Sequence, residues 1–343
     1  MPEIFNYKET FQLESGKSLP GFHLAYTTLG ELNSLKDNVV WVFHALTANS
    51  NATEWWPGLI GEAQLFNPAE YFIICVNMPG SCYGSISPLD NERFHDFTLF
   101  SIKDMVAAYQ KLKDFLGIDK INIGIGGSMG GQQLLEWAVT EPSLFNHIIP
   151  IATNAQHSPW AIAFNAAQRI SIETDETWKE KNERAGIDGM KAARSIALLS
   201  YRNYETYQTA QAENNNAAIE NFKSDSYQRY QGEKLAKRFN AFSYYFLSKS
   251  MDSHNIGRGR ESVQQALKTI GAKTLVIGIS SDILFPTHEQ ELIAANIPNA
   301  ELNVIHSTYG HDGFLLEFEQ MKNIITNFLK KSGVHNKAAL LNN

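Results

Sequence analysis

Six short apolar runs constrain the fold of this chain more than any other feature of its sequence. Each run is followed by glycine, proline or polar residues, and each is nearly continuous rather than alternating. A continuous apolar run of this length predicts a strand that is buried on both faces, as in a parallel sheet covered by helices. The runs are residues 38–47, 71–80, 120–128, 146–155, 272–282 and 300–312.

Helix-like segments lie between several of these runs. Strand–helix alternation predicts an α/β fold with a mostly parallel sheet flanked by helices. The expected helices are residues 101–117, 130–142, 287–298 and a closing amphipathic helix over 317–333.

The alternation stops between about residues 160 and 255, where no convincing buried strand occurs. This stretch is polar and rich in helix-forming residues, with a possible loop over 212–226. We therefore expect a core over 1–160, a helical lid inserted over 161–255, and the rest of the core over 256–335. The final residues, 335–343, are expected to fray.

Composition limits the function classes. The formal net charge of the 343 residues is −7, which gives no electrostatic support for a nucleic-acid partner. The first residues lack the pattern of a signal peptide, and no apolar run is long enough to span a membrane. The two cysteines, Cys75 and Cys82, indicate packing thiols rather than a disulfide framework. The expected compartment is the cytoplasm, without a membrane partner.

The stretch GGSMG (126–130) follows one apolar run and opens a helical segment. It matches G-x-S-x-G in the strand–turn–helix context of a nucleophile elbow, which would lift the Ser128 hydroxyl above the sheet. In such an elbow the Met129 N–H can face a developing oxyanion. The alternative is a glycine-rich phosphate loop, but the Lys-Ser or Lys-Thr of a P-loop is missing and no G-x-G-x-x-G is completed.

A serine nucleophile needs a base and a group that orients the base. Asp282 ends one predicted strand and His311 follows the next, in the acid-then-histidine order of such folds. Asp282 would hold the tautomer of His311, which would act as general base. Two alternatives stay open: His306, in a strand-like run and interpreted as structural, and Asp312, a helix N-cap or a residue that contacts the substrate.

A second oxyanion donor is expected from the loop after the first strong strand. Its backbone N–H would come from Ala45 or Leu46, of which we favour Leu46. His44 precedes the serine in the chain and is interpreted as a residue that shapes this loop.

Several motifs together resemble the homoserine O-acetyltransferases of methionine biosynthesis. The match spans nearly the whole chain, and 13–33 resembles the N-terminal signature of that family. The motifs are FHALT, WWPGLIG, YFIICVNMPGSCYGSISP, GGSMGGQQLLEWA, YQGEKLAKRFNAFSYYFLSKSMD, SDILFP and YGHDGFLLE. One departure is GGQQLLEW, where the family more usually has a Met-Gln-Ala-Leu run.

The resemblance implies an α/β-hydrolase core with a helical lid and a homodimer built through the lid helices. It implies ping-pong transfer of an acetyl group from acetyl-CoA, a co-substrate, to L-homoserine, with no permanently bound cofactor and no metal. By the motifs, Ser128, Asp282 and His311 would form the triad. Arg202 in the lid would bind the substrate carboxylate, and Asp312 its ammonium group, at opposite corners of the site.

Alternatives remain. A homoserine O-succinyltransferase or a serine O-acetyltransferase of the same family stays an alternative. A plain serine esterase would use the same triad, and a non-enzymatic scaffold would be expected to lack one of its members.

Overall fold

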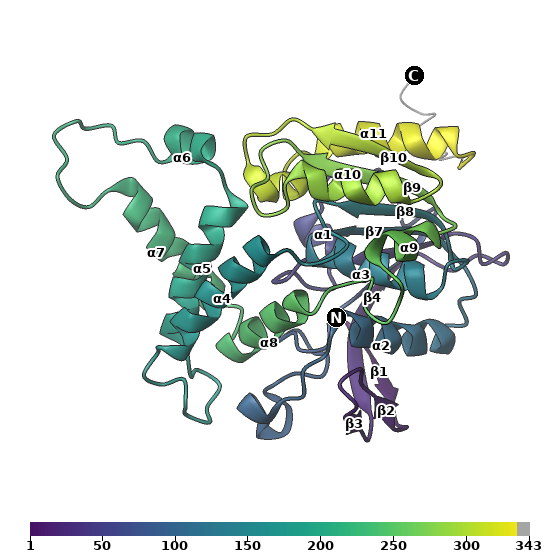
Figure 1. Ribbon diagram of the computed structural model, residues 1–343, viewed down its shortest axis with the longest axis horizontal. Coiled ribbons are helices and arrows are strands. Elements are labelled where there is room, and N and C mark those ends of the chain that lie inside the picture. Colours follow the sequence, from purple (N-terminus) through teal and green to yellow (C-terminus); the bar gives the residue numbers. More distant parts are fainter. Residues whose placement is uncertain (335–343) are drawn as a thin grey trace.

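The computed structural model describes residues 1–334 and is built on an eight-stranded sheet in the order β1-β4-β6-β5-β7-β8-β9-β10 (Figure 1). The strands from β6 to β10 in that order pair in parallel. The strands of this sheet are β1 (Glu3–Tyr7), β4 (Phe22–Leu29), β5 (Val39–Phe43), β6 (Phe72–Val76), β7 (Ile121–Gly127), β8 (Phe145–Ile151), β9 (Lys273–Ile279) and β10 (Ala300–Ile305). All six apolar runs therefore contain a parallel strand, and the predicted fold class is confirmed.

The parallel strands are apolar on both faces because each face is covered. In β5, Trp41 and Phe43 belong to one buried cluster, whereas Val40 and Val42 belong to the other. Neighbouring side chains of a strand point to opposite faces, so a strand between two layers has to be apolar at nearly every position.

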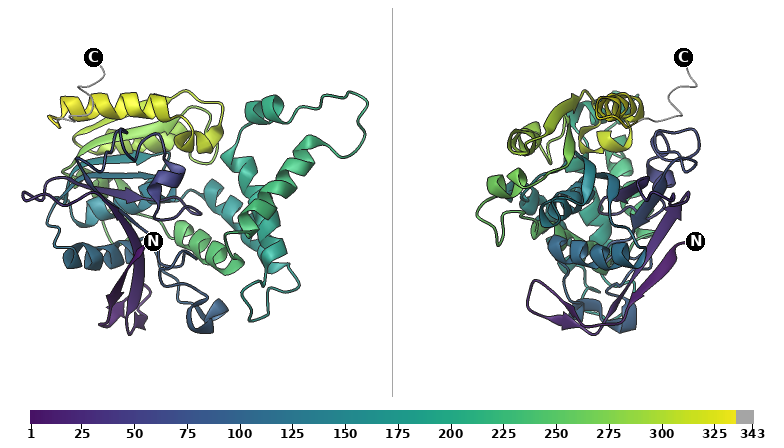
Figure 2. Two further views of the ribbon diagram at one scale, coloured as in Figure 1. Left: turned by 180° about the vertical axis from the view of Figure 1, so that it is seen from behind. Right: turned by 90° about the vertical axis from the view of Figure 1, so that its right-hand side faces the viewer.

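Two layers of helices cover these faces. Residues of α2, α3, α9 and α10 contribute to the first cluster, and residues of α1 and α11 to the second. In the right-hand view of Figure 2, which is turned by 90° from Figure 1, the yellow helix α11 is seen nearly end-on. The helices are α1 (Ala52–Trp55), α2 (Ile102–Phe115), α3 (Met129–Thr140), α9 (Val263–Lys268), α10 (Thr287–Asn296) and α11 (Phe318–Lys331), with short 3-10 turns η1 (Asp90–Glu92), η2 (Phe94–Asp96) and η3 (Gly310–Leu315).

The N-terminal region contains strands that the apolar runs did not indicate. β4 pairs antiparallel with both β1 and β6, and β2 (Phe11–Gln12) forms a small hairpin with β3 (Ser18–Leu19). In β1 only Phe5 is buried, opposite Leu24 of β4. A half-exposed or very short strand gives no continuous apolar run, so this region was missed.

Five helices lie between β8 and α9 and project beyond the end of the sheet (Figures 1 and 2). We call them the lid helices: α4 (Pro159–Glu173), α5 (Ile187–Tyr201), α6 (Tyr204–Ala210), α7 (Lys223–Ala236) and α8 (Ala241–Asp252). The predicted loop over 212–226 is too long, because α7 begins at Lys223. The predicted boundary at 161 falls inside α4, and residues 335–343, including the last residue of the segment 256–335, lie outside the described residues.

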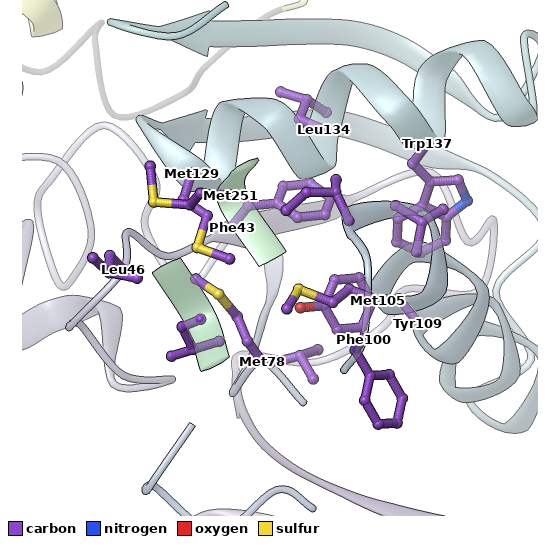
Figure 3. Packing of buried hydrophobic residues seen from close by; sticks show 14 of the residues in the cluster. Phe43, Leu46, Met78, Phe100, Met105, Tyr109, Met129, Leu134, Trp137 and Met251 are labelled. Carbon is purple, nitrogen blue, oxygen red and sulfur yellow. The ribbon is translucent and has the colours of Figure 1, made fainter. Parts of the chain in front are cut away.

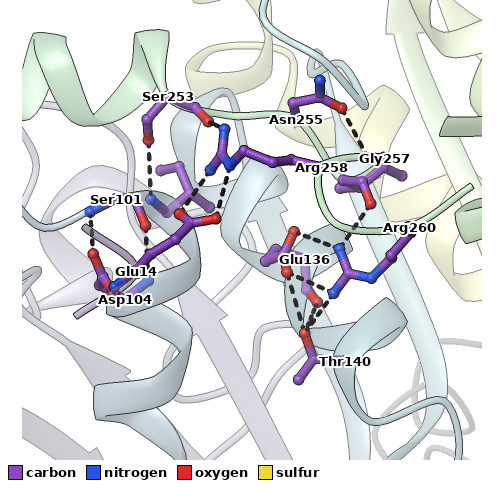
Figure 4. Close-up of polar contacts among 12 residues, drawn as sticks. Glu14, Ser101, Asp104, Glu136, Thr140, Ser253, Asn255, Gly257, Arg258 and Arg260 are labelled. Atoms are coloured by element: carbon purple, nitrogen blue, oxygen red, sulfur yellow. Dashed lines mark hydrogen bonds and ion pairs between the residues drawn. The ribbon is translucent and has the colours of Figure 1, made fainter. Parts of the chain in front are cut away.

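The two chain segments that enter and leave the lid lie side by side. Gln156 and Asn255 form an antiparallel bridge, and the His157 N–H donates to the His254 carbonyl at 2.9 Å. The outgoing segment is then fixed by two arginines (Figure 4). Arg258 contacts Glu14 at 2.7 and 2.8 Å, and Arg260 contacts Glu136 of α3 at 2.8 Å.

One lid helix is part of the core. Almost every residue of α8 is buried, and its Met251 belongs to the same cluster as Met78, Met129 and Leu46 (Figure 3). The lid is therefore seated on the core through α8, next to the start of α3. Among residues 1–334, no helix combines the length and apolar character needed to cross a bilayer.

Candidate active site

Ser128 stands at the junction between β7 and α3 in a strained backbone conformation. Its φ and ψ angles are 56° and −125°, a backbone conformation that residues other than glycine rarely adopt. Its N–H donates to the Ile151 carbonyl at 2.9 Å, and its own carbonyl accepts from the Thr153 hydroxyl at 2.8 Å. Contacts on both sides hold the strained residue, as a nucleophile elbow requires.

Two glycines of the motif are required by close backbone approaches. A Cβ on Gly130 would lie 2.1 Å from the Phe43 carbonyl oxygen, and one on Gly126 would lie 2.7 Å from the Gly130 carbonyl. The first turn of α3 can therefore pack directly against the end of β5. This contact brings Met129 close to the loop that follows β5, where the second oxyanion donor is predicted.

Asp282 and His311 form a buried hydrogen-bonded pair. His311 Nδ1 lies 2.7 Å from Asp282 Oδ2, and the two side chains are 4% and 0% exposed. The other carboxylate oxygen, Oδ1, accepts from the backbone N–H groups of Leu284 and Phe285 at 2.8 and 2.9 Å. With Asp282 ionised, Nδ1 must donate, which leaves Nε2 of His311 free to accept a proton.

The sheet brings this pair to the edge that carries Ser128. β7, β9 and β10 run parallel, and the three predicted triad residues follow their carboxyl ends. Phe314 connects them: its ring lies 5.3 Å from the His311 ring and would be 2.5 Å from a Cβ on Gly127. Among residues 1–334, no hydrogen bond joins the Ser128 hydroxyl to His311, a contact that often tightens only with substrate.

The predicted oxyanion donors have free N–H groups. Within the described part of the chain, the backbone N–H groups of Leu46 and Met129 have no hydrogen-bond partner. Both residues are buried. Unpaired donors are what an oxyanion hole needs, so the free N–H groups support this assignment, which stays a proposal.

His44 holds the start of this loop, as its interpretation from the sequence requires. The Met78 N–H donates to its Nε2 at 3.2 Å, so Nδ1 carries the proton and donates to the Ala45 carbonyl at 2.9 Å. Burial lowers the pKa of His44 from 6.5 to about 4, which keeps the ring neutral. Both ring nitrogens are thus engaged with backbone, which leaves none to act as a base.

The lid reaches the loop that carries His311. Gly310 has a φ of 62°, and a Cβ there would lie 2.8 Å from the Arg202 carbonyl carbon, so only glycine allows this approach. The Thr206 hydroxyl also donates to the Thr308 carbonyl. Lid and loop therefore pack backbone against backbone at this point.

The two predicted substrate-binding residues lie in direct contact. Arg202 Nη2 is 3.2 Å from Asp312 Oδ2, with side chains 20% and 14% exposed. The expectation that they stand at opposite corners is therefore wrong. The Nε of Arg202 is buried and has no partner within residues 1–334, so this guanidinium has a hydrogen bond left to donate.

The structure also shows the positions of His306 and of the two cysteines. His306 follows β10 and is exposed, so its placement in the strand is wrong; its carbonyl accepts from Gln320. Cys75 and Cys82 are free thiols. Burial raises the pKa of Cys82 to about 11, which makes it a poor nucleophile.

Comparison with known proteins places this chain in a family. A family model described as the alpha/beta hydrolase fold matches residues 38–318. A homoserine O-acetyltransferase of Cyclobacterium marinum is 48% identical over 332 residues, covering 95% of this chain and 94% of the relative. The chain belongs to the homoserine O-acetyltransferase family. Another member, from Chloroherpeton thalassium, is 39% identical over 96% of this chain and 89% of its own length.

Solved structures show the same fold for this family and for esterases. The structure of homoserine O-acetyltransferase from Bacillus anthracis matches with a TM-score of 0.87 at 22% identity, covering 96% of this chain and 97% of that chain. The structure of esterase E22 matches with a TM-score of 0.85 at 21% identity, covering 96% and 99%. The fold alone therefore does not separate transfer from hydrolysis.

Sequence reasoning missed a buried polar network at the base of the lid. Gln132 of α3 donates from Nε2 to His157 Nδ1 and Asn154 Oδ1, both at 3.0 Å. Asn165 of α4 continues the network with Nδ2 3.2 Å from His157 Nε2 and 2.8 Å from Asp252 Oδ1. No local pattern pointed to it, because its members come from segments that are far apart in the sequence.

Proposed function

We propose that this chain transfers an acetyl group from acetyl-CoA to the side-chain hydroxyl of L-homoserine, through an acyl-enzyme on Ser128, in methionine biosynthesis. The family relatives that match over nearly the whole chain carry the name of this activity. The site contains residues to which each step of such a reaction can be assigned.

In the first half-reaction, Ser128 Oγ attacks the thioester carbonyl while His311 Nε2 accepts the hydroxyl proton. Asp282 holds the ring and stabilises the positive charge that forms on it. The N–H groups of Leu46 and Met129 stabilise the oxyanion. The C–S bond then breaks, and CoA leaves as a thiol with the proton returned by His311.

In the second half-reaction, the homoserine hydroxyl attacks the acetyl-serine ester. His311 accepts the hydroxyl proton and returns it to Ser128 Oγ as the ester bond breaks, which restores the free enzyme. Water is the competing nucleophile, so the acceptor has to be oriented and water excluded. We propose that the lid, residues 161–255, does both.

The observation that carries the proposal is the Arg202–Asp312 pair beside His311. The ammonium and carboxylate groups of an α-amino acid are bonded to the same carbon. A neighbouring cation and anion therefore match that zwitterion better than charges at opposite corners. The unpaired Nε of Arg202 can donate to the carboxylate, and Asp312 can receive the ammonium. A plain esterase has no need for such a pair.

We also propose that the protein acts in the cytoplasm as a homodimer through the lid helices. The lid exposes large apolar side chains that a second copy could cover, among them Ile170, Leu199 and Tyr230, each more than half exposed. Two free thiols suit a reducing compartment. Light scattering at several concentrations tests the dimer.

A steady-state screen tests the activity itself. Thiol release would be measured with acetyl-CoA or succinyl-CoA, each with L-homoserine, with L-serine and without acceptor. We expect fast release only with acetyl-CoA and L-homoserine, accompanied by O-acetylhomoserine. Equal release with and without acceptor would make the protein a hydrolase and overturn the proposal.

A further inference from the structure

One lid residue contacts the loop that is proposed to stabilise the oxyanion. Arg238 follows α7, and its side chain leaves the lid to reach the core. Its Nη1 donates to the Thr47 carbonyl at 2.5 Å and lies 2.7 Å from the Tyr83 hydroxyl, while Nη2 lies 3.5 Å from the Thr47 hydroxyl. The two residues joined by the first bond are 191 positions apart.

The contact falls on the turn that contains Leu46. The Ala48 N–H donates to the Ala45 carbonyl at 3.0 Å, which closes a four-residue turn with Leu46 and Thr47 at its centre. The Thr47 carbonyl and the Ala48 N–H belong to one planar peptide group, and the Ala45 carbonyl and the Leu46 N–H belong to another. The turn hydrogen bond joins these two groups, so a bond from Arg238 to the Thr47 carbonyl also restricts the direction of the Leu46 N–H.

Other contacts support the same turn from below. Asn77, which follows β6, accepts from the Ser50 N–H at 2.7 Å and donates to the Tyr83 carbonyl at 2.7 Å. The Tyr83 ring also packs against Phe239 of the lid, with centroids 5.7 Å apart. These contacts fix the ends of the two core loops, whereas the Thr47 carbonyl is held by Arg238.

We propose that Arg238 is a positioning residue for the oxyanion hole, which is completed when the lid is seated on the core. The inference rests on the proposed acyl transfer through Ser128 and Leu46. An oxyanion forms in both half-reactions, so Arg238 should support both. Arg202, by contrast, is proposed to bind only the acceptor.

The test is Arg238→Ala, with Arg229→Ala as the matched control. Arg229 is an exposed arginine of α7 that pairs with Asp225 of the same helix and does not contact the core loops. Loss of one oxyanion donor costs 10²- to 10³-fold in kcat, so a misdirected one should cost roughly 10- to 100-fold. We expect that loss in both the CoA burst and the homoserine step, with KM for homoserine within about twofold of the control, given that acceptor contacts are unchanged.

Two further measurements separate positioning from a general loss of stability. Diethyl p-nitrophenyl phosphate reacts with serine nucleophiles and places its P=O oxygen where the oxyanion forms. The rate of inactivation by this reagent should therefore fall by a similar factor in Arg238→Ala. Arg238→Lys should recover part of the rate, because an ammonium group can reach one acceptor but not both. If Arg238→Ala does not fold, Arg238→Lys and Tyr83→Phe are measured in the same assays and should show smaller losses in both half-reactions.

Control-like rates of the burst and of diethylphosphorylation of Ser128 in folded variants would overturn the inference. So would a loss confined to KM for homoserine, or a lower melting temperature without a change in either rate. Failure of the wild-type protein to form acyl-Ser128 would instead overturn the proposed function, which keeps the two failures distinguishable.

Discussion

The sheet edge and the lid contribute to the candidate site in different ways. At the sheet edge, Asp282 and His311 are almost fully buried and their geometry is set by parallel strands and loop N–H groups. On the lid side, Arg202 and Arg238 are partly or well exposed and reach the core through side chains. Side chains whose rotamers are fixed by packing and by supporting hydrogen bonds hold a geometry more precisely than side chains without that support. The proposed roles divide in the same way: the core would supply the chemistry, and the lid would select and align what reacts.

Removal of the proposed nucleophile is the strongest test of the role proposed for the sheet edge. Ser128→Ala should lower kcat by about 10⁶-fold, by the precedent of serine triads, and abolish the CoA burst. Stopped-flow detection of free thiol measures the burst. Turnover near that of the unmutated protein would place the chemistry somewhere other than the sheet edge.

Asp282→Asn tests the orienting half of the core site. The amide oxygen is expected to keep the N–H groups of Leu284 and Phe285, which turns the NH2 group toward Nδ1 and favours the wrong His311 tautomer. We expect kcat to fall by about 10⁴-fold. The shape of the residue is retained, and circular dichroism should confirm a folded protein. A folded variant with nearly full kcat would assign the orienting role to another residue.

A smaller and more selective effect is expected from the lid. Arg202→Ala removes a charge-assisted contact worth about 1.5–3 kcal/mol, or roughly 10- to 150-fold in kcat/KM for homoserine. The CoA burst should stay close to that of the Arg229→Ala control. Arg202→Lys should recover only part of the loss, since it lacks the two-donor fork.

The rate of the CoA burst and the rate of the homoserine step, measured on the same Arg202→Ala sample, show which half-reaction depends on Arg202. A burst slowed as much as the homoserine step would show that Arg202 does more than bind the acceptor, and an effect on neither would remove it from the site.

The smallest expected effect concerns pH and the base of the lid. Burial lowers the pKa of His157 to about 4 and that of His254 to about 3, from 6.5. Below pH 6.5 these histidines bind protons in the unfolded chain but stay neutral in the folded protein. The free energy of unfolding should therefore fall as the pH drops from 6.5 toward 4. For His157 the loss is at most about 3 kcal/mol.

Urea unfolding at pH 7 and pH 4.5 measures the total loss, to which His44 of the core also contributes, and hydrogen exchange locates the part that belongs to the lid. We expect the exchange of lid amides in α4 and α8 to increase before that of β7 and β8. His157→Gln should flatten the pH dependence. If the sheet and the lid lose protection together, the lid is not a separately opening unit and the comparison between the two regions fails.

The core site was accessible from the sequence because its signals are local. Ser128 is identified by the glycines around it, and Asp282 and His311 by the ends of apolar runs that the parallel sheet then brings together. Strand β1 has a single buried residue and β4 mixes apolar residues with histidine and threonines, so neither carries such a signal. Their pairing depends on one buried face and on contacts across the chain.

The lid contacts could not be derived in the same way. Helical character over 160–255 follows from composition, but the direction in which the helices pack does not. Arg238 lies in a motif that was recognised as a whole, yet its contact with Thr47 depends on the position of α7 in three dimensions. The Arg202–Asp312 contact likewise depends on the backbone approach at Gly310.

The mass of the protein during turnover tests the central claim most directly. Rapid quench after mixing with acetyl-CoA alone should give one added acetyl group on the peptide that contains Ser128. Addition of L-homoserine should remove it much faster than water does, with O-acetylhomoserine formed in equal amount. Turnover without any adduct, or an adduct lost equally fast with and without homoserine, would contradict an acyl transfer in which the core reacts and the lid selects the acceptor.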